Sequence, residues 1–327
     1  LPPERYLTIH QATDRSLYHN PKINSSNYIV IPELQKIFSK DIEEIIKNLT
    51  EGVDSTYTRT NSKRNGVDTF KIDKKPILYS FAITNKHLKE RDDEFYRRFI
   101  IFHTDISREQ NKKVALSFAE RELQPETKVE NYSAWQGHIS ACLDSTAEIK
   151  NPFLPHIIES LPPEISEQVR FRSSVKYLHQ LICGATLFNS VADKINQKYL
   201  FSELSDNLKV TELYEQVLID NLYGLSVIDR ALLDLLGNEP THIEAVKQRF
   251  GEIYATAIPI EDSLSKLTAN GLVGKEGDEY RLRIVPKITF NPEQALDAAD
   301  KFMQLHYPKY RDQWHEQCLK QTETHAE

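Results

Sequence analysis

The chain has 327 residues, of which 39% are hydrophobic and 27% charged, a composition that excludes an intrinsically disordered protein. No apolar run approaches the roughly 20 residues that a membrane-spanning helix needs. The 41 Lys and Arg residues against 48 Asp and Glu give a net charge of −7, so any affinity for nucleic acid has to come from a local basic patch. We therefore expect a mainly helical protein without a membrane partner.

The cysteines and the only methionine bear on compartment and processing. Cys142, Cys183 and Cys318 are odd in number and far apart, which argues against a disulfide framework and against a CxxC zinc site. A reducing cytoplasm is the expected compartment, and no metal site of protein ligands is expected. Because the chain opens at Leu1 and its only methionine is Met303, we expect further sequence upstream.

The first elements predicted along the chain are two buried strands. Residues 28–31 form a short β-branched run that stops at Pro32-Glu33, and a second apolar run extends from Ile77 to Thr84. Between them the pattern predicts a helix over residues 34–49. The polar segment 56–75, with Asn65-Gly66 as a turn signal, is predicted to form a β-hairpin.

The next predicted elements complete a sheet and begin a helical region. Residues 99–103 form a third apolar run, and three such strands with helical or hairpin connections predict an α/β sheet. Residues 107–223 have a helical pattern, interrupted by prolines between Asn151 and Pro163. This region is expected to be a helical lid domain.

The last part of the chain predicts a winged helix and a tail. Helical patterns over residues 227–236, 242–250 and 261–269 precede a short hairpin, the order of elements in a winged helix. The tail from Pro292 is amphipathic and is expected to pack on a neighbour. Its apolar positions at helical spacing are Ala295, Ala298, Ala299, Phe302 and Leu305.

The order of these motifs resembles an AAA+ ATPase core of the MCM-like and phage- or plasmid-type replicative helicases. The resemblance rests on the strand ending at Glu33, the hairpin, Ile83-Thr84-Asn85 and Arg97-Arg98-Phe99. The fold class that it implies is an α/β AAA+ core, second half with the P-loop absent, followed by an α-helical lid and a C-terminal winged helix, mainly α overall. The implied domains are the partial core 1–105, the lid 106–223, the winged helix 224–286 and a helical tail 287–327.

The resemblance assigns catalytic roles to two residues that follow strands. Glu33 corresponds to the Walker B acid that polarises the attacking water in phosphoryl transfer. The aspartate that helps hold Mg²⁺ in most AAA+ proteins is replaced by Pro32. Asn85 corresponds to the sensor 1 residue, which bonds the nucleotide phosphate or the water. A capping asparagine is the alternative interpretation of Asn85.

Four arginines are implied to contact phosphate. Arg97 and Arg98 precede an apolar run, as the arginine finger does in MCM-like proteins, and Arg98 matches better. The alternative for this pair is a surface salt-bridge cluster with the acidic residues 92–94. Arg170 and Arg172 open a helix and are equal candidates on spacing for the sensor 2 arginine, which reaches the nucleotide from the lid.

The hairpin is the expected DNA contact. In the resembling helicases, a hairpin before sensor 1 tracks single-stranded DNA through phosphate charge in the central channel of a ring. Six cations lie in this segment against two aspartates, although a solvated charged face is the alternative. The six are Arg59, Lys63, Arg64, Lys71, Lys74 and Lys75, of which Lys63 and Arg64 lie beside the turn.

The winged helix offers fewer cations. Lys266 is the only one in its third helix, which is a poor basis for reading a major groove. Lys275, Arg281 and Arg283 on the wing are candidates for phosphate contacts. Because the fold alone does not select a function, docking or regulation is an equal alternative for this domain.

These observations support two hypotheses. The first is a DNA-dependent ATPase fragment of a homo-oligomeric helicase or translocase ring, with ATP and Mg²⁺ as cofactors of the intact protein. No GxxxxGK[ST] motif occurs in the chain, so this stretch alone is not expected to bind ATP in the usual way, and a P-loop is expected upstream. The second hypothesis is a non-enzymatic winged-helix DNA-binding or replication adaptor protein.

Overall fold

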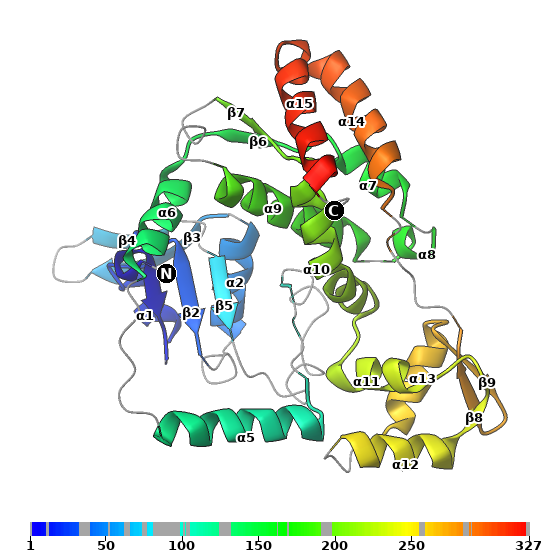
Figure 1. The fold of residues 1–327 in the computed structure, drawn as a ribbon. Helices are drawn as coiled ribbons and strands as arrows, with labels where there is room; N and C mark the ends of the chain where they lie inside the picture. The colour runs from blue at the N-terminus through cyan, green and yellow to red at the C-terminus, as the bar shows by residue number, and fades with distance from the viewer. Residues whose placement is uncertain are drawn as a thin grey trace. The chain divides into compact units, whose positions relative to one another are not determined.

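The computed structural model divides the chain into two compact units, and the described residues are mainly helical with small sheets (Figure 1). One unit contains Leu1–Phe99 and Tyr132–Asp144, and the other contains Ile100–Asn131 and Ser145–Glu327. The described residues are 2–10, 13–32, 40–51, 53–61, 66–73, 77–80, 99–100, 102, 105–123, 132–161, 163–168, 170–190, 198–254, 259–283, 288 and 290–324.

A three-stranded parallel sheet forms the centre of the first unit. Strand β2 (Tyr28–Ile31) pairs with β1 (Tyr6–Thr8) on one side and with β5 (Ile77–Ser80) on the other. Tyr28, Ile29 and Ile31 are buried, as expected for a parallel strand covered on both faces. The strand predicted over residues 28–31 is confirmed. Its partner is confirmed from Ile77 to Ser80, and residues 81–84 lie outside the described residues.

Helices of the first unit supply the rest of its core. Helix α2 (Lys40–Glu51) contributes a stripe of four buried residues spaced three and four apart, which are Ile42, Ile45, Ile46 and Leu49. Its described part confirms the helix predicted over 34–49, whose first residues lie outside the described chain. Helix α1 (Asp14–Tyr18) buries Leu17, and α6 (Ser133–Asp144) is tied to a short 3₁₀ helix, η1 (Pro3–Arg5), by Arg5 and Asp144.

The predicted β-hairpin is present. Strands β3 (Ser55–Asn61) and β4 (Gly66–Ile72) pair antiparallel over their whole length, from Ser55 opposite Ile72 to Asn61 opposite Gly66. Side chains alternate along β4, so that Val67, Thr69 and Lys71 are exposed while Phe70 is half-buried. Residues 62–65, which connect the strands, lie outside the described residues.

The second unit is built around two long helices. Helix α9 (Phe171–Asn189) packs along α10 (Leu204–Tyr223), and β6 (Glu148–Lys150) pairs in parallel with β7 (Tyr199–Phe201). The prolines between 151 and 163 separate two short helices, α7 (Leu154–Glu159) and α8 (Pro163–Ser166), which confirms the predicted break. Helix α5 (Arg108–Leu123) is exposed from Asn111 to Glu120.

The end of the second unit contains the three-helix segment and the tail. The three helices are α11 (Val227–Leu235), α12 (Ile243–Ile253) and α13 (Glu261–Ala269). Strands β8 (Thr241–His242), β10 (Glu279–Leu282) and β9 (Val273–Glu276) form an antiparallel sheet in that order. Each predicted helix and the hairpin of this segment are present. The tail forms two packed helices, α14 (Pro292–His306) and α15 (Pro308–Thr324).

Two expectations are corrected by the structure. The third strand predicted over 99–103 is absent at the described residues Phe99, Ile100 and Phe102. The boundary between the two units falls after Phe99; Phe99 packs on the core of the first unit and Ile100 on that of the second, so this apolar run is divided between two cores. In α14 the fully buried face comprises Ala295, Ala299 and Met303, whereas Leu305 is 76% exposed.

Candidate nucleotide and nucleic-acid contact residues

The parallel sheet aligns the ends of the two strands that precede the catalytic candidates. Ile31, the last residue of β2, lies opposite Ser80, the last residue of β5. Both strands run in the same direction, so the chain leaves them at the same edge of the sheet. Glu33 follows β2 by two residues and Asn85 follows β5 by five. Both lie outside the described residues, as do Arg97 and Arg98.

The described cations of the hairpin are paired within the first unit. Arg59 Nε lies 3.4 Å from Asp68 Oδ2, and its guanidinium lies 5.4 Å from the centre of the Phe70 ring. Lys71 Nζ lies 2.6 Å from Asp54 Oδ2 and 3.8 Å from Asp73 Oδ2. The hydrogen bond to Asp54 raises the pKa of Lys71. Two of the six hairpin cations therefore have intramolecular counterions.

The remaining four hairpin cations lie outside the described residues. They are Lys63, Arg64, Lys74 and Lys75. Lys63 and Arg64 belong to the connection between β3 and β4, and Lys74 and Lys75 follow β4. Asp68 and Asp73 already belong to the hairpin segment, whereas Asp54 precedes it, so the pairing of Lys71 with Asp54 lowers the local positive charge expected from the segment's composition.

The base of the hairpin is fixed by an aromatic cluster that the sequence did not predict. The Tyr18 and Tyr57 rings stack at 5.5 Å, and the His19 ring lies 4.2 Å from the Phe70 ring. The hydroxyl groups of Tyr18 and Ser55 are 2.6 Å apart. The only sequence signal for these contacts is the alternation that puts Tyr57 and Phe70 on one face of two strands.

A side chain of the loop before β2 also fixes the base of the hairpin. Asn24 Nδ2 donates to the carbonyl oxygen of Lys71 at 2.8 Å, and Asn24 Oδ1 accepts from the backbone N–H of Asp73 at 3.2 Å. The side-chain amide thus pairs with the edge of β4 as a neighbouring strand would. The exit of the hairpin is held at two backbone groups.

The two candidate lid arginines have different environments. Arg170 is the N-cap residue of α9, and its Nη1 donates to the carbonyl oxygen of Asn221 at 3.3 Å, near Gly224. Arg172 lies in the first turn of α9 and is exposed. Arg170 is therefore engaged at the end of α10, which leaves Arg172 as the candidate whose side chain is accessible.

The cation of the third helix of the 227–282 segment is also engaged within the protein. Lys266 Nζ donates to the carbonyl oxygen of Gly224 at 2.6 Å and to Asp229 Oδ2 at 2.7 Å. The Asp229 side chain is 2% exposed. Burial raises the pKa of Asp229, but the hydrogen bonds from Lys266 and the backbone of Ser226 outweigh it, so the pKa lies below its usual value.

The wing carries exposed cations together with acids. Lys275 lies with its Nζ 5.4 Å from the Tyr280 ring centre, and Arg281 Nη2 pairs with Glu276 Oε1 at 2.8 Å. Arg283 is exposed at the end of β10. On α13, the exposed side chains of the first turn are Glu261 and Asp262. The surface of this segment is therefore mixed in charge.

Within the described residues, no group of three or more His, Cys, Asp or Glu side chains could hold a metal ion, and no helix is long and apolar enough to cross a membrane. No model of a known protein family matches the chain, and no curated protein does either.

Proposed function

We propose that this chain forms the hydrolytic and DNA-facing half of a DNA-dependent AAA+ ATPase motor, a replicative-type helicase or translocase. The observation that carries the proposal is the register of β2 on β5, with Ile31 opposite Ser80. Open α/β sheets bind ligands outside the carboxyl ends of their strands. Glu33 and Asn85 follow these two strand ends in the sequence, as expected for residues that act on one nucleotide.

The hairpin supports a DNA contact at its connection. It is inserted between β2 and β5 in the chain and is fixed at its base by Tyr18 and Asn24. Because Arg59 and Lys71 have carboxylate partners, we assign the contact with single-stranded DNA to Lys63 and Arg64. Phosphate charge gives such contacts their affinity and their salt dependence.

The remaining parts of the proposal concern the nucleotide and the assembly. ATP and Mg²⁺ are the proposed cofactors, with Arg172 reaching the nucleotide from the lid and Arg98 reaching it from a neighbouring copy of the chain. A guanidinium suits both positions, because its fixed charge stabilises the phosphate oxygens in the transition state. A homo-oligomeric ring follows, since Arg98 acts across a subunit interface.

We assign a docking role to the 227–282 segment. Its helix order and its sheet order β8-β10-β9 support a winged helix. Lys266, however, is bound to Asp229, and on the third helix Asp262 is exposed while Glu261 is paired with Lys247 at 2.9 Å. The Asp262 carboxylate would repel DNA phosphates and the cation of that helix is already engaged, which favours a protein partner over insertion into a groove.

The ATPase test uses the protein with its natural upstream sequence. We expect DNA-stimulated ATP hydrolysis, and we expect Glu33→Gln to abolish turnover while nucleotide binding remains. Glu44→Gln, which removes the same charge from an exposed position on α2, should leave turnover unchanged. The absence of an encoded upstream P-loop, or of DNA-stimulated hydrolysis in the intact protein, would contradict the proposal.

The alternative is a non-enzymatic DNA-binding or replication adaptor, favoured by the absence of a P-loop motif from the chain and by Pro32 in the Walker B position. It predicts that nucleotide does not change DNA binding, either by this chain alone or by the protein with its upstream sequence.

The DNA contact is tested on the chain itself by fluorescence anisotropy with a single-stranded oligonucleotide at several salt concentrations. We expect Lys63→Ala/Arg64→Ala to weaken binding by about tenfold or more and to reduce the salt slope by about 1 to 2.

A charge-matched double variant serves as the control for this titration. Lys112 and Lys113 are adjacent and exposed on α5, so Lys112→Ala/Lys113→Ala removes the same charge from another surface. Its binding should stay near that of the unmodified chain. If Lys63→Ala/Arg64→Ala binds the oligonucleotide as tightly as the unmodified chain, the hairpin is not the DNA contact in either the motor or the adaptor proposal.

A further inference from the structure

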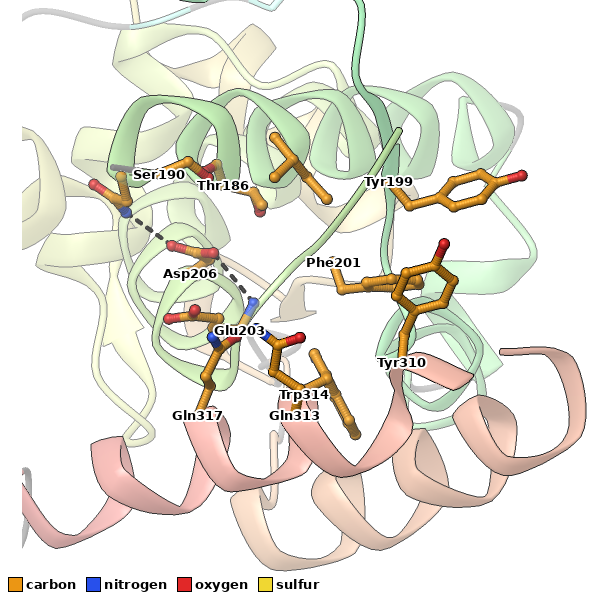
Figure 2. A pocket seen from close by; sticks show the side chains of 12 residues that line it. Thr186, Ser190, Tyr199, Phe201, Glu203, Asp206, Tyr310, Gln313, Trp314 and Gln317 are labelled. Atoms are coloured by element: carbon orange, nitrogen blue, oxygen red, sulfur yellow. Dashed lines mark hydrogen bonds between the residues drawn. The ribbon is translucent and has the colours of Figure 1, made fainter. Parts of the chain in front are cut away.

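A pocket of about 240 Å³ lies in the second unit, between the end of α9, strand β7, the start of α10 and helix α15 (Figure 2). Figure 2 shows two chemically different sides. Tyr199, Phe201 and Tyr310 are on one side, and the carboxylates of Glu203 and Asp206 are on the other. The pocket is not needed by any step of the proposed ATPase mechanism.

The acidic side of the pocket is built into the fold. Asp206 is only 3% exposed, and its Oδ1 accepts from Asn189 Nδ2 at 2.8 Å while its Oδ2 accepts from the backbone N–H of Glu203 at 3.2 Å. Glu203 and Asp206 form the capping box of α10, which fixes their positions. No Lys, Arg or His is among the described residues that line the pocket. Its formal charge is therefore negative.

The aromatic side offers faces for an apolar or cationic group. Phe201 and Tyr199 project from the same face of β7, because they are two residues apart, and their ring centres lie 5.5 and 5.8 Å from that of Tyr310. Outside the pocket lining, the ammonium group of Lys198 already lies 5.0 Å from the Tyr199 ring. Aromatic faces attract cations at such distances.

We propose that this pocket binds an alkyl ammonium or guanidinium group, supplied by a lysine or arginine side chain of a partner or by a free polyamine. The cationic head lies at Glu203 and Asp206, and the hydrocarbon stem lies along Phe201 and Tyr310. Gln313 and Gln317 on α15 provide amide oxygens for the remaining N–H groups. An anion is excluded by the two carboxylates, whose negative charge would repel it.

A tryptophan gives the binding experiment a local signal. Trp314 lines the pocket, is 2% exposed, and donates from Nε1 to the carbonyl oxygen of Ser202 at 3.0 Å. The only other tryptophan of the chain is Trp135, on α6 in the first unit. The variant Trp135→Phe therefore makes the fluorescence of Trp314 the only tryptophan signal.

The titration uses agmatine and a short acetylated peptide with a single arginine, in the Trp135→Phe chain. We expect a saturable change of Trp314 fluorescence that weakens with salt, and at least tenfold weaker binding of the neutral analogue butylurea. Tighter binding of the peptide identifies a protein side chain as the source, and tighter binding of agmatine identifies a free polyamine. Equal binding of butylurea would overturn the proposal.

Two substitutions test the assignment of the acidic side. Glu203→Gln keeps a side-chain oxygen for the helix cap, and we expect it to weaken binding of both cations by about tenfold. Glu212→Gln removes the same charge from an exposed position of α10 and should not change binding. Unchanged binding by Glu203→Gln, or no saturable response to either probe, would overturn the proposal.

A third variant tests whether the chain itself supplies the cation. Lys194 belongs to residues 191–197, which connect α9 to β7 and lie outside the described residues. We expect Lys194→Ala to bind both probes as the parent does. If the probes bind only after this substitution, the occupant is a lysine of the same chain and the proposal of an external ligand is wrong. The outcome does not depend on ATP or DNA, so it stands apart from the proposed motor function.

Discussion

Lys266 is a residue whose role in the structure differs from the role that the sequence predicts. As the only cation of a predicted third helix, it was a candidate for DNA binding. Its ammonium group instead bonds the carbonyl oxygen of Gly224, the C-cap residue of α10, and the carboxylate of Asp229 near the start of α11. Neither partner is close to it in sequence, so no local pattern could predict the contact.

Replacing Lys266 should destabilise the second unit. Lys266→Met leaves the buried carboxylate of Asp229 without its cation, and we expect the free energy of unfolding to fall by about 2 kcal/mol, below the usual cost for a fully buried pair because Lys266 is partly exposed. Urea unfolding at pH 7 measures the change. Lys247→Met, which removes a cation from two surface carboxylates, Glu244 and Glu261, is the control and should change nothing measurable.

The loss of stability caused by Lys266→Met should become smaller at acidic pH. The folded pKa of Asp229 is below its unfolded value, so its stabilisation is complete above the unfolded pKa of about 3.9 and is lost as pH falls through the folded pKa. In Lys266→Met the unpaired carboxyl protonates more readily and relieves its own penalty. We expect the difference between parent and variant to narrow from pH 7 to about pH 4. A constant difference would contradict the assigned ion pair.

At the scale of elements, the end of α10 is set by glycine geometry. Gly224 has φ of +59°, and a Cβ there would lie 3.3 Å from Arg170 Nη1. We expect Gly224→Ala to lower the free energy of unfolding by about 2 kcal/mol. Gly271 has φ of +75° with open space around it, so Gly271→Ala should show only the backbone strain of about 1 kcal/mol. If Gly224→Ala and Gly271→Ala lower the free energy of unfolding equally, the Arg170 side chain moves away from the new Cβ without a further loss of stability.

A closed ring of buried polar side chains joins β6, β7 and α10. Asn151 Nδ2 donates to Asn207 Oδ1 at 3.0 Å, Ser202 Oγ donates to Asn151 Oδ1 at 2.8 Å, and Asn207 Nδ2 donates to Ser202 Oγ at 3.2 Å. All three are at least nine-tenths buried. Asn207→Ala leaves Asn151 and Ser202 each without one hydrogen bond. We expect the free energy of unfolding to fall by about 3 kcal/mol, as measured by thermal and urea unfolding. Lys209→Ala, at an exposed position of α10, is the comparison and should change the free energy of unfolding by less than about 0.5 kcal/mol.

Local signals account for the elements that the sequence predicted. The β-branched run of β2, Asn65-Gly66 in the hairpin and the apolar spacing of α11 to α13 are all contained within short windows. Strand β1 was missed because Tyr6–Thr8 is only three residues long and owes its conformation to β2. Phe99, Ile100 and Phe102 were wrongly assigned to a strand, because the sequence of a short apolar run does not show whether its residues pack into one core or into two.

For the candidate site, the sequence predicts which residues carry charge, but not which residues they pair with in the fold. It named Arg59, Lys71 and Lys266 as cations, and the structure gives each a carboxylate. It could not find the pocket of the second unit, because Tyr310 lies more than 100 residues after Tyr199 and Asp206 along the chain. Glu33, Asn85, Arg97 and Arg98 lie outside the described residues and stay predictions.

At the scale of the whole molecule, the two units have separate cores. One core is centred on Ile29, Ile45 and Ile72, and the other on Leu178, Leu232 and Met303. We expect unfolding in more than one step, which violates two-state behaviour. Hydrogen exchange followed by mass spectrometry should therefore give different opening free energies for β2 and for α9. Identical values under all urea concentrations would show that the units unfold together.

A buried thiol gives an independent readout of the second unit. Cys318 is fully buried, and burial raises its pKa to about 12; burial also raises the pKa of Cys142 in the first unit, which is only partly buried. Because the thiolate is the reactive form, a thiol reagent at pH 8 should label Cys142 in the folded chain and Cys318 only after unfolding. Fast labelling of Cys318 in native buffer would contradict the packing of α15.

The proposed ring makes a prediction for mixed subunits of the protein with its upstream sequence. Glu33→Gln and Arg98→Ala should each be inactive alone. If Arg98 acts across the interface, equal random mixing restores Glu33 and Arg98 together at about one quarter of the interfaces, and ATP hydrolysis recovers to about that fraction. No recovery on mixing would place Arg98 and Glu33 in the same site of one subunit.

The anchored hairpin has a mechanical consequence. From Ser55 to Asn61, β3 spans about 20 Å, while the contacts of Tyr18, His19 and Asn24 are all near the other end of the ladder. The hairpin would then pivot at its base, where the aromatic cluster holds it. A rotation of about 10° at that pivot displaces the far end of the ladder by roughly 3 to 4 Å. Small rotations transmitted through α1 would thus be amplified at the end of the ladder formed by Asn61 and Gly66.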